Sequence, residues 1–218
     1  MVLSVSLCAR GGVVEFAKSS GITGGLVVHV GCGDGKITAA LRANDSFVVQ
    51  GIDTNPANAA KTRQHAKTLG LSGKVSSDTF DGKALPYTDN LVNLLVVSNA
   101  YQISKDEMLR VLSPGGVVLL IKGDTCEKIT KPRKDIDEWT HYLHGPGNNA
   151  VANDMVVGPP RHMQWLSGPR WTRTHHGLNS ISAVVTANGR LFYIVDESTA
   201  ASNAVPGKWT VVARDAFS

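Results

Sequence analysis

The chain has 218 residues, of which 42% are hydrophobic and 18% are charged, and this composition predicts a soluble globular protein with one full domain and part of another. No apolar run approaches the length that crosses a membrane, so we expect no membrane span. The net charge of +4 is only mildly basic, and it does not by itself indicate a nucleic-acid partner.

Cysteine and histidine give no metal-ligand pattern. The three cysteines, Cys8, Cys32 and Cys126, lack metal-ligand spacing, and their odd number indicates no disulfide framework. The histidines of the C-terminal half have no cysteine or nearby carboxylate to complete a ligand set, so no metal ligand is assigned. These histidines are His141, His144, His162, His175 and His176. His141 and His144 are three residues apart and would share a face if a helix forms there.

The first predicted element is a short helix over residues 13–19, which ends near Ser20 and Gly21. Before it, residues 1–8 are apolar but short and have no basic leader, so they do not predict a signal peptide. A cytoplasmic location is therefore the default expectation. Export is the alternative if the complete protein carries a signal peptide.

A strand, a glycine-rich turn and a helix come next, and the rest of the chain is organised around them. Residues 26–30 form an apolar run typical of a buried parallel strand. Gly31, Gly33 and Gly35 then alternate along the turn, where glycine lets the backbone bend sharply and approach a ligand. A helical pattern over residues 36–42 follows, so this segment predicts a nucleotide-type binding site.

A second apolar strand, residues 47–53, ends in Asp53, whose carboxylate can accept both hydroxyls of a ribose. The helix after it is predicted to have Asn55 as its N-cap and Pro56 at its first position, with Gly70 as the stop. A helix directly after this strand completes a βαβ unit.

Two more strands are predicted, over residues 74–80 and residues 91–97. The first of these is less apolar, which places it nearer the edge of the sheet. The second is the most apolar run of the chain and is expected at the centre, where both faces of a parallel sheet are covered.

A capping box of Ser104 and Glu107 begins the next predicted helix. That helix ends near Ser113, because Pro114 disfavours helical geometry in the residue before it. The fifth strand is predicted over residues 117–121.

Three segments together resemble the class I S-adenosylmethionine-dependent methyltransferases. The run Gly31-Cys32-Gly33-Asp34-Gly35 fits the glycine motif of that family. Asp81-Gly82-Lys83-Ala84-Leu85-Pro86 looks like its Asp-x-x-x-Leu-Pro segment, and Leu112-Ser113-Pro114-Gly115-Gly116 looks like its turn before the fifth strand. The resemblance covers about residues 13–122 and implies an α/β, Rossmann-like fold, in which helices flank a mainly parallel twisted sheet.

The resemblance also implies a site for S-adenosylmethionine, with S-adenosylhomocysteine as the product. The glycine loop would hold the amino-acid end of the cofactor, Asp53 its ribose, and Asp81 its adenine amino group. Asp78 is the alternate for Asp81, which could instead be a turn aspartate before Gly82. The expected cofactor-binding residues are His29, Gly31, Cys32, Gly33, Asp53, Thr54, Asp81, Gly82 and Ser98.

The chain departs from the family pattern at several positions. His29 and Asn93 stand where the family usually has acids, and residues 98–101 lack the prolines of the amino-group methyltransferase motif. No catalytic residue is assigned: His29 and Tyr101 are candidate bases, and Asn99 and Tyr101 are candidate substrate contacts. A dinucleotide-binding dehydrogenase is the competing interpretation, but its third glycine would fall at Lys36.

The character of the chain changes after residue 122. Residues 122–137 are polar and charged and predict a solvated linker or a helix start, and residues 123–180 are assigned as a linker or wrapping segment. Residues 139–171, with three of the four tryptophans, resemble the lead-in to quinoprotein-type β-propellers, and residues 209–216 resemble the start of the propeller repeat. This predicts a truncated gene product that joins a methyltransferase-like domain, residues 1–122, to a propeller fragment.

A β-hairpin is predicted over residues 181–195, with its turn at Asn188 and Gly189. Residues 181–218 are assigned either to a fragment of a propeller blade or to the antiparallel pair that completes the methyltransferase sheet. A blade fragment would leave strand edges unpaired, which predicts self-association.

Two functional hypotheses follow. The first is methyl transfer from S-adenosylmethionine to an unknown acceptor, in which the protein mainly positions the reactants. The second is a catalytically degenerate methyltransferase-like module that docks with the propeller, and the departures at His29 and Asn93 favour it.

Overall fold

The computed structural model describes residues 4–7, 12–98, 101–123, 125–156, 158, 181–198 and 205–217. The chain divides into two compact units. The N-terminal unit comprises Met1–Arg133 with Phe217–Ser218, and the C-terminal unit comprises Lys134–Ala216. The N-terminal unit thus extends beyond residue 122, where the sequence places the boundary, because its sheet gains one more strand there.

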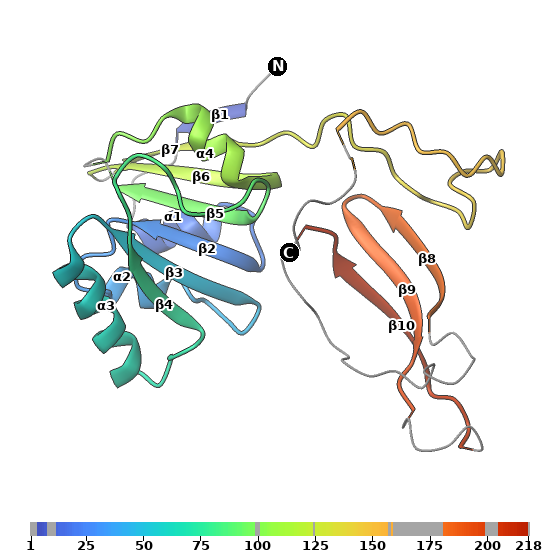
Figure 1. Ribbon diagram of the computed structural model, residues 1–218, viewed down its shortest axis with the longest axis horizontal. Helices are drawn as coiled ribbons and strands as arrows, with labels where there is room; N and C mark the ends of the chain where they lie inside the picture. The colour runs from blue at the N-terminus through green and yellow to red at the C-terminus, as the bar shows by residue number, and fades with distance from the viewer. Residues whose placement is uncertain are drawn as a thin grey trace. The chain divides into compact units, whose positions relative to one another are not determined.

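The N-terminal unit is built on one sheet of seven strands (Figure 1). They are β1 (Ser4–Leu7), β2 (Gly25–Val30), β3 (Phe47–Asp53), β4 (Val75–Thr79), β5 (Val92–Ser98), β6 (Leu112–Lys122) and β7 (Thr125–Thr130). Their order across the sheet is β1-β7-β6-β5-β2-β3-β4. The pairs from β6 to β4 are all parallel, whereas β7 is antiparallel to both β6 and β1.

This strand order is that of a Rossmann-like fold. After β2 the chain adds β3 and β4 on one side, and it then crosses back to add β5 and β6 on the other. The point where the order reverses, between β2 and β5, is where ligands bind in open α/β sheets, just beyond the carboxyl ends of the strands. The predictions that β4 lies at the edge and β5 at the centre are confirmed.

Within the described residues, four helices cover the two faces of the sheet: α1 (Val13–Ser19), α2 (Lys36–Ala40), α3 (Pro56–Thr68) and α4 (Lys105–Val111). Phe16 of α1 and Ala66 of α3 belong to one apolar cluster, and Met108 of α4 belongs to the other. Successive side chains of a strand point to opposite faces, so Val27 joins the first cluster and Val28 the second. The short α1 is therefore a packing helix.

The predicted ends of α3 are confirmed. The Asn55 side chain accepts a hydrogen bond from the Ala57 N–H at 2.9 Å, and Pro56 occupies the first helical position. At the other end Gly70 has a φ of 67°, and the N–H of Leu71 reaches back to the Ala66 carbonyl at 2.9 Å. This pattern is a glycine-based helix stop, in which the last carbonyls find donors.

The capping box of α4 is only half confirmed. The Ser104 hydroxyl accepts a hydrogen bond from the Glu107 N–H at 3.2 Å, as predicted. The Glu107 carboxylate, however, accepts from the Leu85 N–H at 2.7 Å and pairs with Arg110, so it binds a distant loop instead of its own helix start. A tertiary partner has replaced the local one.

Residues 122–137 are not simply a linker or the start of a helix, and that prediction is wrong. Residues 125–130 form β7, with Cys126 and Ile129 buried against the two core clusters. Residues 125–130 have only two apolar side chains, which is enough for a strand near the edge of the sheet, where β7 is flanked by β1. Strand β6 also begins earlier than predicted, at Leu112, with a register shift that absorbs the Pro-Gly-Gly turn.

The C-terminal unit contains a three-stranded antiparallel sheet in the order β10-β9-β8, with β8 (Ile181–Ala187), β9 (Arg190–Asp196) and β10 (Trp209–Asp215) (Figure 1). The predicted hairpin is confirmed, with Asn188 and Gly189 at φ values of 56° and 71°. Its proposed role in completing the methyltransferase sheet is wrong, because β7 and β1 occupy that edge. The third strand, β10, pairs with β9 along its whole length.

The C-terminal unit buries few side chains. Among its described residues only Val195 and Asp196 are buried, and the Asp196 carboxylate accepts hydrogen bonds from the N–H groups of Ser198 and Lys208 at 3.0 and 2.9 Å. These bonds hold the two ends of the connection between β9 and β10. None of the helices in the described ranges is long and apolar enough to cross a membrane.

Candidate cofactor-binding site

The glycine loop lies at the carboxyl end of β2, at the point where the strand order reverses. Gly31, Gly33 and Gly35 have φ values of 85°, 56° and 85°, a region that side chains with a Cβ rarely adopt. The Gly31 N–H donates to the Ile52 carbonyl at 2.8 Å, which ties the loop to the end of β3. A Cβ added at Gly31 would lie 2.5 Å from the Ser98 hydroxyl oxygen, so the loop also touches the end of β5.

Gly35 serves the packing of the loop, not its open face. A Cβ there would lie 2.6 Å from the Thr62 Cα, so only glycine lets α2 approach α3 this closely. The buried Thr62 hydroxyl is 3.4 Å from the Gly33 carbonyl, to which it donates. No sequence pattern marks Thr62, because its role depends on the contact between α2 and α3.

Asp53, the expected ribose acid, ends β3 and is only 3% exposed. One carboxylate oxygen accepts from the Asn55 N–H at 2.9 Å. The other accepts from the Gly33 N–H at 3.3 Å and from the Asn58 amide at 3.1 Å. Asn58 was not predicted, although its place in the first turn of the helix after the acidic strand could have suggested it.

These contacts keep Asp53 ionised. Burial opposes the charge, but the N–H donors of Asn55 and Gly33 and the Asn58 amide outweigh it and hold the pKa of Asp53 below its ordinary value. The site therefore presents a fixed negative charge beside the glycine loop, as a carboxylate that binds ribose hydroxyls would require.

His29 lies inside the protein beneath the loop. Its side chain is 4% exposed, and its Nδ1 is 2.8 Å from the hydroxyl of Thr38, which is fully buried. Burial lowers the pKa of His29 to about 4, although the nearby charge of Asp53 opposes this shift. At neutral pH His29 is thus an uncharged packing and hydrogen-bonding residue, which does not supply the charge of the family's acid.

The Cys32 side chain also points inward. It is 3% exposed, and a Cβ added at Gly51 would meet the Cys32 Cβ at 2.7 Å. Burial raises the pKa of its thiol, so Cys32 is a protonated small residue that fills space under the loop.

Asp81 lies at the start of an exposed turn. One oxygen of its carboxylate accepts from the N–H groups of both Lys83 and Ala84 at 2.8 Å, which is the geometry of a turn aspartate. Gly82, at a φ of 83°, lies against Thr54, and a Cβ on it would be 3.1 Å from the Thr54 side chain. The turn therefore borders the site beside Asp53, and Asp78 lies on the exposed edge strand β4.

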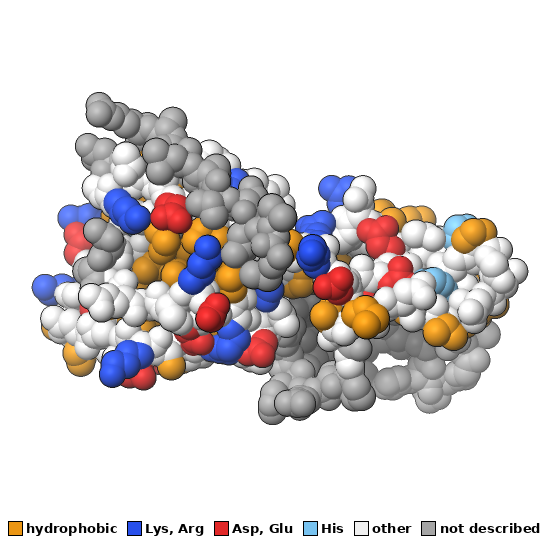
Figure 2. Space-filling view, turned by 90° about the horizontal axis from the view of Figure 1, so that it is seen from above, with side chains coloured by type: hydrophobic (Ala, Val, Ile, Leu, Met, Phe, Trp, Pro, Cys, Tyr) orange, Lys and Arg blue, Asp and Glu red, His pale blue; other side chains and the backbone are white. Residues whose placement is uncertain are grey.

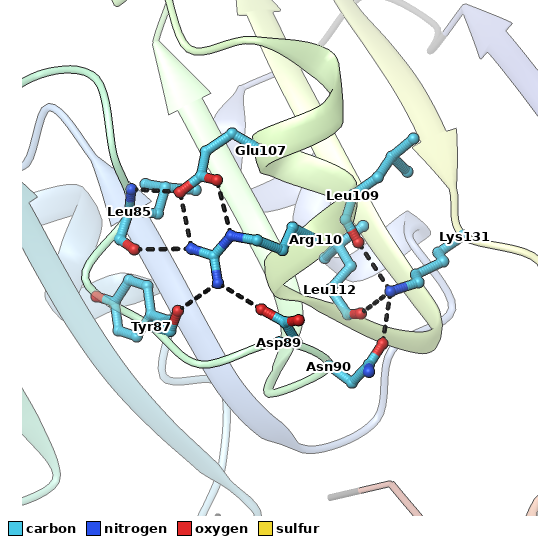
Figure 3. A network of polar contacts seen from close by, with 9 residues as sticks. All are labelled: Leu85, Tyr87, Asp89, Asn90, Glu107, Leu109, Arg110, Leu112 and Lys131. Atoms are coloured by element: carbon cyan, nitrogen blue, oxygen red, sulfur yellow. Dashed lines mark hydrogen bonds and ion pairs between the residues drawn. The ribbon is translucent and has the colours of Figure 1, made fainter. Parts of the chain in front are cut away.

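A polar network holds the segment after this turn against α4 (Figure 3). The Arg110 guanidinium donates to the carbonyls of Leu85 and Tyr87 at 3.1 and 2.8 Å and pairs with Asp89 at 2.7 Å. It also forms two 2.8 Å bonds with Glu107, whose carboxylate takes the Leu85 N–H. The hydrogen bonds from Arg110 lower the pKa of Glu107.

Lys131 extends this anchoring to the turn before β6. Its ammonium group donates to the carbonyls of Leu109 and Leu112 at 2.8 and 2.7 Å and to the Asn90 side chain at 2.6 Å (Figure 3). Lys131 is the residue that directly follows β7. This strand, which was not predicted from the sequence, therefore helps to hold the loop that borders the candidate site.

Tyr101 lies over the glycine loop. The ring of Tyr101 packs against that of Phe80, with 5.8 Å between their centroids, and a Cβ added at Gly31 would be 2.8 Å from its Cε2. Its hydroxyl lies near Thr54 and Asp53 and contributes to the lowered pKa of the Asp53 carboxyl. Asn99, the other predicted substrate contact, lies outside the described residues.

Asn93 has a structural role that explains its departure from an acid. Its side-chain oxygen accepts from the Leu26 N–H at 2.9 Å, and its amide donates to the Ser113 hydroxyl and the Phe217 carbonyl, each at 3.2 Å. A carboxylate could accept from Leu26 but could not donate to the Phe217 carbonyl. The amide therefore suits this position.

No metal centre emerges from the described ranges, where no three His, Cys, Asp or Glu side chains gather as a ligand group. His141 and His144 do not share a helix face: they form an isolated antiparallel bridge, and His144 pairs with Asp137 at 2.7 Å. His162, His175 and His176 lie outside the described residues. On the face shown in Figure 2, basic and acidic side chains are intermixed, so that face offers no single-signed stripe to a polyanion.

The N-terminal unit has a Rossmann-like fold with a glycine loop and an acid at the carboxyl ends of β2 and β3. Residues 27–116 match the model of a family described as a methyltransferase domain, and this range contains the glycine loop, Asp53 and the Asp81 turn. The match ends at Gly116, before β7 and the C-terminal unit.

Two curated proteins similar to this chain are methyltransferases. The chain is 33% identical to methyltransferase GfsG of Streptomyces halstedii over 96 residues, which cover 41% of this chain and 34% of that protein. It is 28% identical to norajmaline N-methyltransferase of Rauvolfia serpentina over 101 residues, which cover 44% and 35%. The chain thus spans about a third of the length of the curated relatives it matches. A SAM-dependent methyltransferase structure from Aquifex aeolicus aligns with a TM-score of 0.44 at 21% identity, over 49% of this chain and 61% of that one.

Proposed function

We propose that the N-terminal unit binds S-adenosylmethionine at the carboxyl ends of β2, β3 and β5 and transfers its methyl group to an acceptor that is still unidentified. The observation that carries this proposal is the joining of the glycine loop to Asp53. The Gly33 N–H donates to the Asp53 carboxylate at 3.3 Å, so the two parts of the proposed nucleoside site are in direct contact.

The residues of the proposed site would contact different parts of the cofactor. The backbone of Gly31, Cys32 and Gly33 would face the amino-acid end of the cofactor, and Asp53 would accept the ribose hydroxyls. The Asp81 turn, with Gly82 and Thr54, would border the adenine, and Ser98 would face the loop from the end of β5. His29 would support the loop from beneath, as a neutral partner of Thr38.

The chemistry needs positioning more than acid–base catalysis. When bound, the cofactor supplies a sulfonium methyl group, and methyl transfer forms a bond from the acceptor to that carbon as the carbon–sulfur bond breaks. The protein would bring the acceptor into line with the methyl group and exclude water. No general base is assigned, since His29 is buried away from the open face of the loop.

A second candidate is a methyltransferase-shaped docking module without catalysis. The neutral His29, the occupied Asp53 carboxylate and the three-stranded sheet of the C-terminal unit favour it. In this proposal the sheet β8–β9–β10 would be part of a β-propeller blade. Self-association through its exposed Val211 would follow. An active enzyme would be expected in the cytoplasm, where its cofactor is made.

Calorimetric titration of the purified chain with S-adenosylmethionine and S-adenosylhomocysteine tests the proposal. We expect micromolar binding of both, on the order of −8 kcal/mol, which Asp53→Ala abolishes. NAD should give no heat. A well-folded chain that binds neither compound would leave only the docking module.

A further inference from the structure

Tyr101 lies over the proposed cofactor site, just after the end of β5. Its N–H donates to the Ser98 carbonyl at 3.3 Å. Its side chain lies close to Gly31 after β2, Asp53 at the end of β3 and Phe80 after β4. One side chain thus contacts all three loops that border the nucleoside part of the proposed site.

The contacts of Tyr101 imitate those of a nucleoside. A planar ring lies near the Phe80 ring and over the backbone of Gly31, while a hydroxyl on that ring faces the Asp53 carboxylate. A bound ribose would direct its hydroxyls to that same carboxylate. A Cβ added at Gly31 would lie 2.8 Å from the ring, so no ligand atom fits between the ring and this backbone, and a nucleoside that lay against Gly31 would have to displace the tyrosine.

We propose that Tyr101 covers the nucleoside part of the proposed site and has to swing out before S-adenosylmethionine binds. This inference rests on the proposed function of the site. A site open only part of the time binds with an affinity reduced by the open fraction, so Tyr101 lowers the apparent affinity of the cofactor. The contact of its ring with Phe80 and its close approach to Gly31 favour the closed position.

Titration of the full chain with S-adenosylhomocysteine tests this gate. Tyr101→Ala removes the ring and should tighten binding about tenfold or more, and Tyr101→Phe, which loses only the hydroxyl, should give a smaller gain. Tyr193→Phe is the matched control, since it removes a hydroxyl that accepts from Arg214 in the C-terminal unit, and it should leave binding unchanged. Weaker or unchanged binding by Tyr101→Ala would overturn the gate, because the ring would then be a cofactor contact or a bystander.

A second measurement needs no cofactor. In protein labelled with 3-fluorotyrosine, the ¹⁹F resonance of Tyr101 is assigned by its loss in Tyr101→Phe. If the ring lies against Asp53, Asp53→Asn should shift this resonance, while that of the exposed Tyr142 stays in place. An unmoved Tyr101 resonance would overturn the gate. If no variant binds S-adenosylhomocysteine but the resonance moves, the groove is closed as described and the proposed function is what fails.

Discussion

His29 shows how burial sets the chemistry of a single residue. It stands two positions before the first glycine of the loop, yet its ring points into the core against Thr38. An unpaired charge there would be costly, so the imidazole stays neutral at physiological pH. The identity of the residue was visible in the sequence, whereas its protonation state depended on the solvent-free space around it.

His29 should make the stability of the N-terminal unit depend on pH. Its folded pKa of about 4 lies below its ordinary value of 6.5, so the unfolded chain takes up the proton first as pH falls. The stabilisation is complete above pH 6.5 and is lost between pH 6.5 and about 4, by up to about 3 kcal/mol. Urea unfolding followed by circular dichroism at several pH values measures this loss.

The window between pH 6.5 and 5 is the most informative, because few carboxylates titrate there. His29→Gln, which can still hydrogen-bond but cannot take up a proton, should flatten the pH dependence in this window. His65→Gln, which removes a histidine from α3 of the same unit, should keep it. An equal pH slope in the wild type and His29→Gln would contradict the burial argument.

At the scale of elements, α4 acts through the loop it anchors. A helix of seven residues contributes little by itself, but Glu107 and Arg110 on it capture both the N–H and the carbonyl of Leu85. The segment between the Asp81 turn and β5 therefore has several of its backbone groups bonded to side chains of α4, without forming a helix or strand (Figure 3). The position of the Asp81 turn depends on this network.

Arg110→Ala should loosen that loop. The substitution removes the donor of the Tyr87 carbonyl and one of the two donors of the Leu85 carbonyl, and it should cost about 2 kcal/mol of unfolding free energy. Amide hydrogen exchange over residues 81–90 should accelerate, and S-adenosylhomocysteine should bind more weakly. Lys105→Ala, which removes a positive charge from an exposed position of the same helix, is the control and should change neither. Unaltered exchange in Arg110→Ala would show that the loop is held by other contacts.

At the scale of the whole molecule, the two units differ in the cores they possess. The N-terminal unit has an apolar cluster on each face of its sheet, whereas the described part of the C-terminal unit buries only Val195 and Asp196. Buried apolar area is the main source of stability, so the C-terminal unit should be the weaker of the two. The tryptophans that report on it are Trp139, Trp165, Trp171 and Trp209.

Unfolding should therefore occur in two steps. Because all four tryptophans belong to the C-terminal unit, their fluorescence should change at a lower urea concentration than the far-ultraviolet circular dichroism, which is dominated by the N-terminal unit. Parallel urea titrations with both probes measure this separation. Coincident transitions would mean that the two units unfold together.

Much of the parallel core was predictable, because its signals are local in sequence. Apolar runs marked β2, β3 and β5, Asn55 with Pro56 and Gly70 marked the ends of α3, and Asn188-Gly189 marked the hairpin turn. The glycine loop was recognisable because its three positive φ angles require glycine. The antiparallel strands β1 and β7 were missed, since their few apolar residues become meaningful only when the strands pair.

The sequence by itself determined the glycine loop, the acid at the end of β3 and the apolar strands that precede them, because each depends on local sequence patterns. Only the tertiary structure decided what these residues face. Burial made His29 neutral and turned the Cys32 thiol inward, and packing brought Tyr101 over Gly31 beside Asp53. Those outcomes depend on solvent exclusion and on contacts between distant segments, neither of which is encoded in the spacing of neighbouring residues.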